Sequence, residues 1–307
     1  MITSIFSKSK PINFVIVFFI MMVAFTKANI MLFKESMSIT TFFEQTGLFF
    51  LCCFIILTFN FIVSKNSLTN NNHYQILLFG LFFLMIPQTT IGENILFSNI
   101  FVLLGLRRTL SLRNPTRNKS KLFDAAIWFA IAALFYFWAI LFFVLIFSAL
   151  LLYTDNRIKN WIIPFAGLAT VFIIATSVSI VLYDDFFKVF HFTTGVSYNY
   201  TNYDTAQFLI AITILLSFGI WASFFYVKIS NNKKKALRPS FKLIFIALLI
   251  AFVTTILAPQ KDGSEFLFLF APLSIVITNY IENIEEKWFK EGFLILLIVA
   301  SLVLLVL

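Results

Sequence analysis

Lys261 is the residue whose type and setting point most directly to chemistry. It lies in the short polar segment Pro259-Gln-Lys-Asp-Gly-Ser-Glu265, between two apolar runs. A lone ammonium group beside acidic residues suits a phosphate, such as the diphosphate of a polyprenyl carrier at a membrane surface. The alternative is a local salt bridge within a turn, since Asp262-Gly263 is typical turn sequence.

A second polar segment begins with the adjacent acids Asp184 and Asp185. Three phenylalanines follow at helical spacing, which predicts a short helix lying on the membrane surface. The segment continues as Tyr198-Asn-Tyr-Thr-Asn-Tyr-Asp204, a mixture of aromatic and polar residues. It is either an interfacial anchor or an acidic and aromatic rim that holds a polar substrate such as a sugar. In the second case Asp184 and Asp185 bind sugar hydroxyls or a metal.

The elements that must position these residues are membrane-spanning helices. Of the 307 residues, 60% are hydrophobic and only 12% charged, and the mean hydropathy is +0.94. Soluble domains have about 25% charged residues, so this chain has too few to cover a water-facing surface. The net charge of +9 fits topology signals and anionic lipid, and no nucleic-acid motif accompanies it. The two histidines and two adjacent cysteines have no metal-ligand spacing, and any metal or cofactor stays unknown.

Apolar runs predict the crossings of the membrane. They cover about 11–26, 46–64, 74–87, 94–106, 122–153, 161–183, 206–227, 243–258, 265–281 and 292–307. Several are shorter than the ~20 residues that an upright helix needs, so such helices are expected to thin the bilayer, to draw on flanking interfacial residues or to sit inside the bundle. The run 122–153 is instead too long for one upright helix.

Positive charge decides how often this long run crosses. If it crosses once, 11 Lys/Arg residues lie on the inner side and 12 on the outer side. If it crosses twice, with a tight hairpin near Ala133 to Trp138, the counts become 19 and 4. The positive-inside rule favours the second count. The sequence therefore predicts an all-α, polytopic helix bundle of about 11 spans (10–12), forming a single membrane domain over 1–307. The N-terminus is expected inside and the C-terminus outside, with short surface helices in the outer loops.

Three stretches resemble an uncharacterised family of multi-pass inner-membrane proteins of flavobacteria and their relatives. They run from Ser4 to Asn13, from Arg107 to Ala126 and from Lys261 to Pro272. The resemblance implies a location in the bacterial inner membrane. Together with the charge count, this predicts a cytoplasmic N-terminus and a periplasmic C-terminus. It implies no activity.

The architecture is also similar to that of lipid-dependent, multi-pass glycosyltransferases of the GT-C type. The shared features are an inside N-terminus, an acidic first outer loop and a basic loop followed by a tight apolar pair, as in 107–153. In that class an acidic residue of the first outer loop acts at the acceptor or the metal, which here implies Glu35 or Glu44. The chain departs from the class in having no Asp in that loop and no large outer domain.

Three functions stay open. The first is an outer-face transferase on a polyprenyl-linked sugar, with Glu35 or Glu44 as base, Asp184 and Asp185 on sugar or metal, and Lys261 on phosphate. The second is a non-catalytic subunit that assembles with envelope proteins. The third is a transporter of a lipid or amphiphile, which the lack of interior charge and of a visible repeat disfavours.

Overall fold

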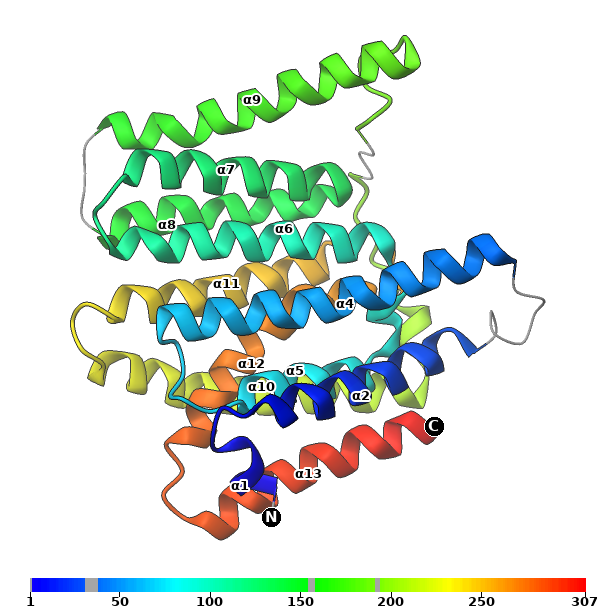
Figure 1. Cartoon of the computed structure of the whole chain (residues 1–307), viewed down its shortest axis with the longest axis vertical. Coiled ribbons are helices and arrows are strands. Elements are labelled where there is room, and N and C mark those ends of the chain that lie inside the picture. The colour runs from blue at the N-terminus through cyan, green and yellow to red at the C-terminus, as the bar shows by residue number, and fades with distance from the viewer. Residues whose placement is uncertain (1, 31–37, 154–157, 191–193) are drawn as a thin grey trace. The chain divides into compact units, whose positions relative to one another are not determined.

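The computed structural model describes residues 2–30, 38–153, 158–190 and 194–307, and in these residues every regular element is helical. The predicted all-α class is confirmed. The α-helices are α1 (Ile2–Phe6), α2 (Pro11–Ala28), α4 (Ile39–Asn66), α5 (Tyr74–Met85), α6 (Glu93–Leu110), α7 (Asn118–Phe135), α8 (Val144–Tyr153), α9 (Ile158–Tyr183), α10 (Ala206–Asn232), α11 (Arg238–Ile256), α12 (Leu267–Glu282) and α13 (Lys287–Val306) (Figure 1). Short 3-10 helices are η1 (Pro87–Thr90), η2 (Ser111–Arg113), η3 (Phe137–Phe143), η4 (Thr201–Tyr203) and η5 (Ser264–Phe266).

Eight of the described helical segments are long and apolar enough to cross a membrane. They contain α2, α4, α6, α9, α10, α11, α12 and α13. Two shorter apolar helical segments are Tyr74–Met85 and Phe137–Tyr153. Since a soluble protein would expose few such helices to water, the chain is a membrane protein of several spans.

The chain folds as two compact units, each built from segments distant in sequence. The first contains residues 1–96, 198–232 and 260–307. At its centre are α5 and α12, which pack on each other and are flanked by α2, α10 and α13. All twelve residues of α5 are buried, and at 1.5 Å per residue this helix is only about 18 Å long. Of the three alternatives for a short run, α5 therefore follows the one in which the helix sits inside the bundle.

Aromatic rings hold the centre of this first unit together. The Phe270 ring of α12 lies 5.9 Å from that of Phe79 and 5.7 Å from that of Phe83, both at near-perpendicular angles. Edge-to-face pairs of this kind add about 0.5–1.5 kcal/mol beyond the burial of their area. Phe79, Phe83 and Phe270 thus interlock in the core of this unit.

The second unit contains residues 97–197 and 233–259. Helix α7 packs along α9 and against the antiparallel segment η3–α8, which in turn packs on α11 (Figure 1). Helices α7 and α9 approach each other closely. A Cβ built on Gly167 would lie 2.7 Å from the Cβ of Ala126, so glycine is required there.

The long apolar run 122–153 is divided into two helical segments, as the charge count predicted. Helix α7 ends at Phe135, Tyr136 is extended with φ −143° and ψ 106°, and η3 begins at Phe137. The hairpin predicted near Ala133 to Trp138 is confirmed. On the neighbouring side, the Ser98 hydroxyl of α6 donates 2.9 Å to the carbonyl of Ala132, a residue of the last turn of α7.

The predicted surface helix after Asp184 is wrong. Asp184 has a positive φ of 54°, and the Asp185 carboxylate accepts a 3.0 Å hydrogen bond from the N–H of Phe187. This local bond holds the chain in a turn instead of a helix. Within the described part of the chain, the 3-10 helices η1, η4 and η5 lie in or next to the loops that were predicted to be outer, and residues 39–45 of the first of these loops belong to α4.

Candidate functional site

Polar residues from three loops of the first unit meet near one end of α12. The loops are η1 with the residues after it, the segment that contains η4, and the segment 260–266 that leads into η5. A Cβ on Gly92 would lie 3.0 Å from the Cβ of Ser264. The Asn202 side-chain amide donates 3.0 Å to the carbonyl of Lys261. Residues far apart in sequence therefore share one polar cluster, which we call the Lys261 cluster: Tyr200, Asn202, Tyr203, Lys261 and Glu265.

A tight turn positions Lys261 and Glu265 relative to each other. The Asp262 carboxylate accepts bonds from the Ser264 N–H at 3.0 Å and from the Ser264 hydroxyl at 2.5 Å. Gly263 has φ +94°, a value that side chains rarely adopt. The turn predicted at Asp262-Gly263 is confirmed. A Cβ on Gly263 would lie 2.6 Å from the Phe208 ring, so packing also requires glycine here.

Glu265 is the acid of the Lys261 cluster, and none of its surface is exposed. The Tyr203 hydroxyl donates a hydrogen bond to its Oε1, and the Gly263 N–H donates to its Oε2 at 3.0 Å. The Tyr203 ring packs 5.3 Å from that of Phe208 and 5.8 Å from that of Phe266. Burial of a carboxyl group is costly unless donors satisfy it, and these two donors meet that need.

Lys261 is also almost fully buried, with 3% of its surface exposed. Its ammonium group lies 5.0 Å from the centre of the Tyr200 ring. Such a cation–π contact partly replaces lost hydration. Burial away from water lowers the pKa of Lys261 from its ordinary value. Tyr200 is 43% exposed, so its ring lies between the ammonium group and the outside.

This arrangement has the groups for anion binding and for proton transfer. An ammonium group covered by an aromatic ring can bind a phosphate that displaces the ring. A carboxyl group bonded to a phenol can hold or pass a proton. Among the residues that the structure describes, no three His, Cys, Asp or Glu side chains group as metal ligands.

The other predicted site residues do not join the Lys261 cluster within the first unit. Glu44 was expected in the first outer loop, but it lies on an exposed face in the second turn of α4. Helix α4 starts at Ile39, earlier than expected, because the Ser38 side chain accepts from the N–H of Thr41 and caps it. Glu35 lies outside the described residues.

Asp184 and Asp185 belong to the second unit and are both exposed. Asp184 directly follows the end of α9, and Asp185 uses one oxygen to hold the turn described above. Lys188 in the same turn has its ammonium group 5.0 Å from the centre of the Tyr183 ring. These two acids thus stand on an exposed loop, where their predicted substrate-binding role stays a prediction.

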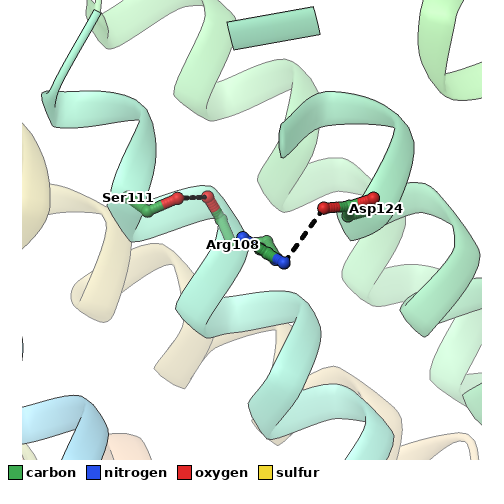
Figure 2. Close-up of polar contacts among 3 residues, drawn as sticks. All are labelled: Arg108, Ser111 and Asp124. Carbon is green, nitrogen blue, oxygen red and sulfur yellow. Dashed lines mark hydrogen bonds and ion pairs between the residues drawn. The ribbon is translucent and has the colours of Figure 1, made fainter. Parts of the chain in front are cut away.

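Asp124, which lies three residues after the basic segment 107–121, has a structural partner. Asp124 of α7 forms an ion pair of 3.1 Å with Arg108 of α6, as Figure 2 shows. Ser111 donates to the carbonyl of Arg108 at 2.7 Å, and Lys121 donates to the carbonyls of Ser111 and Asn114. These contacts fasten the loop between the two helices. Since the ion pair is partly exposed, it is worth about 0–1 kcal/mol.

Glu265 and Tyr203 were not predicted as site residues. Glu265 counted only as one more acid on the outer side, and Tyr203 only as part of a tyrosine-rich segment. The sequence contained one indication that Glu265 is functional. It is an acid at the start of an apolar run, where a membrane helix rarely has an ionisable side chain. What that acid contacts depends on a residue 62 positions away.

Comparison with known families places the whole chain in one group. The chain belongs to the "Family of unknown function (DUF6427)", whose model matches residues 1–307. No curated protein and no solved structure matches the chain. Family membership agrees with the expected likeness to an uncharacterised family and gives no activity.

Proposed function

We propose that the chain crosses the bacterial inner membrane eleven times, with its N-terminus in the cytoplasm and its C-terminus in the periplasm. The eleven spans are α2, α4, α5, α6, α7, η3–α8, α9, α10, α11, η5–α12 and α13. The count of 19 inner to 4 outer basic residues supports this topology.

Contacts between helix ends in the first unit support the same topology. Thr3 donates to Glu291 at 2.7 Å, and both residues are inner on the eleven-span count. Lys27 donates to the carbonyl of Leu305 at 2.6 Å, and both are outer. If 122–153 crossed only once, each of these pairs would have to join opposite sides of the membrane. A contact across the ~30 Å hydrocarbon core is impossible for two side chains.

At the outer face, we propose that the protein binds a phosphate-bearing lipid substrate and transfers its sugar, as a lipid-dependent transferase. The observation that carries this proposal is the Lys261 cluster, in which a lysine and a glutamate are buried together at the outer end of a helix. Ionisable groups buried at this cost are common at functional sites. Lys261 would bind the phosphate after Tyr200 swings away.

In this proposal Glu265 and Tyr203 control protons near the bound phosphate. The single O–H of Tyr203, which is donated to Glu265 in the resting site, would turn to the leaving phosphate oxygen and protonate it as the bond to the sugar breaks. The phenolate would then regain a proton from water, in balance with the proton that the acceptor hydroxyl loses. Glu35 or Glu44 would be the base that takes the proton of the acceptor hydroxyl, as the GT-C similarity implies. Binding of sugar hydroxyls or a metal by Asp184 and Asp185 is proposed separately, on the outer loop of the second unit.

Analysis of lipid-linked sugars in a deletion strain tests this function. We expect the substrate lipid to accumulate, and the wild-type gene to reverse the accumulation. A gene with Lys261→Met should fail to reverse it, while Lys188→Met, which removes a lysine over a tyrosine ring at the same distance of 5.0 Å, should succeed.

Two results would contradict the transferase. One is an unchanged set of lipid-linked sugars in the deletion strain. The other is full activity of Lys261→Met at normal protein level. Unchanged sugars together with the loss of an envelope complex would instead favour the non-catalytic assembly partner.

A further inference from the structure

A small polar pocket lies in the first unit, at the end opposite the Lys261 cluster on the topology proposed above. Its volume is about 230 Å³. It is lined only by serine, threonine and asparagine: Ser9 before α2, Ser64 and Ser67 at the end of α4, and the stretch 69–72. Pockets for drug-sized ligands measure roughly 300–1,000 Å³, so this one suits a lipid headgroup or a small solute.

Hydrogen bonds fix the wall that the N-terminal segment provides. The Asn13 side-chain amide donates to the carbonyl of Lys8 at 2.9 Å and lies 3.1 Å from Nδ1 of His73. The N–H of His73 in turn donates to the carbonyl of Phe6 at 2.9 Å. The position of Ser9 is therefore fixed by the hydrogen bonds of the preceding segment and by helix α2, which follows it.

The opposite wall is tied to the end of α12. Glu282 Oε1 accepts from the Asn70 N–H at 2.9 Å and from the Asn72 side chain at 2.6 Å. Asn279 donates to the carbonyl of Leu68 at 2.9 Å. A loop with three bonds to one helix keeps its shape, so the pocket exists before any ligand enters.

Charge around the pocket is mainly positive. Ser9 lies between Lys8 and Lys10, and Lys65 follows Ser64; all three lysines are exposed. The Glu282 carboxylate bonds to the lining, and its Oε1 already accepts two bonds from the loop. Hydroxyl and amide groups can both donate and accept, which suits a ligand with phosphate oxygens and hydroxyl groups together.

We propose that this pocket binds a phosphate ester that also carries hydroxyl groups, the chemistry of the phosphatidylglycerol headgroup. The lining supplies donors to the phosphate and partners to the hydroxyls, and the three lysines attract the negative charge. This binding is independent of the transferase proposed at the other end of the unit.

Native mass spectrometry of the purified full-length protein tests the proposal. The protein is incubated with phosphatidylglycerol or with phosphatidylcholine, and the retained lipid is counted for each variant. The pocket variant combines Ser9→Leu with Asn71→Leu, at two exposed positions. Asn231→Leu, on the exposed surface at the end of α10, is the matched control.

We expect the wild-type protein to retain phosphatidylglycerol over phosphatidylcholine, and the pocket variant to lose about tenfold in apparent affinity. Asn231→Leu should behave as wild type. A second series changes Lys8, Lys10 and Lys65 to Gln, and its charge-matched control changes Lys228, Lys234 and Lys235 to Gln. Only the first triple variant should weaken retention.

Soluble glycerol 3-phosphate distinguishes the two sources of this chemistry. If it displaces the lipid at millimolar concentration, the pocket recognises the phosphate ester alone; if it does not, the site needs the membrane-anchored lipid. Equal retention of the two lipids would overturn the proposal. Loss of phosphatidylglycerol to the same extent in the pocket variant and in Asn231→Leu would do so as well.

Discussion

The side chains of Asn72 and Glu282 meet in a hydrogen bond of 2.6 Å, although 210 residues separate them in the sequence. Asn72 precedes α5, and Glu282 is the last residue of α12. The two central helices of the first unit therefore have these ends at the same level. If both ends lie on the same side of the membrane, as proposed, the chain makes an even number of crossings between Asn72 and Glu282; the eleven-span topology has eight there.

Reporter fusions test the topology directly. A reporter after Lys159 should report the cytoplasm, because 122–153 crosses twice on the eleven-span count. A reporter after Asn199 should report the periplasm. The measurement is the ratio of a periplasm-active to a cytoplasm-active reporter at each site. A periplasmic signal after Lys159 would refute the eleven spans.

Loss of the Tyr203 hydroxyl should destabilise the protein. Tyr203→Phe keeps the packed ring but removes a donor to a carboxyl group with no exposed surface. We expect the free energy of unfolding to fall by about 1–3 kcal/mol. Tyr198→Phe, at a side chain that is 74% exposed, should change it by less than about 0.5 kcal/mol. Unfolding by denaturing detergent measures both; equal values would mean that the bond adds no stability.

Stability should rise with pH in the alkaline range because of Lys261. Burial lowers the pKa of Lys261 in the folded protein below its ordinary value of 10.5. Between these two values the unfolded chain binds more protons than the folded chain, so the free energy of unfolding increases with pH. Lys261→Met should remove that part of the slope.

The matched control for this pH series is Lys188→Met, since Lys188 is exposed and also lies over a tyrosine ring. The melting temperature in detergent, followed from neutral pH to pH about 10.5, is the measurement. A slope that Lys261→Met leaves unchanged would argue against the burial of this ammonium group.

Close packing of α7 and α9 predicts opposite effects of two glycine substitutions. Gly167→Ala would place its Cβ 2.7 Å from that of Ala126 and 3.0 Å from the carbonyl of Phe123, so we expect a loss of about 1–3 kcal/mol. Gly47→Ala meets nothing within 4 Å and should stabilise α4 by up to about 1 kcal/mol. Thermal unfolding of both variants compares them. Two changes of the same sign would contradict the packing of α9 on α7.

The helices and most of their ends could be predicted from the sequence. Apolar runs identify helices that water cannot solvate, and charge asymmetry identified the break at Tyr136. Both signals are local or additive, so they need no knowledge of packing. The predicted start of α4 was seven residues too late. Ser38 caps the helix, so residues 39–45, which include Glu44, are helical.

The Lys261 cluster depends on tertiary structure. Lys261 stood out in the sequence as a rare outer cation, but its burial under Tyr200 and the pairing of Tyr203 with Glu265 require loops about 60 residues apart to meet. Hydropathy indicates that a segment is buried away from water, but it does not indicate which other segment it contacts. The composition by itself determined that this chain is a membrane protein. Which polar groups are buried together was decided only by the packing of α10 and α12.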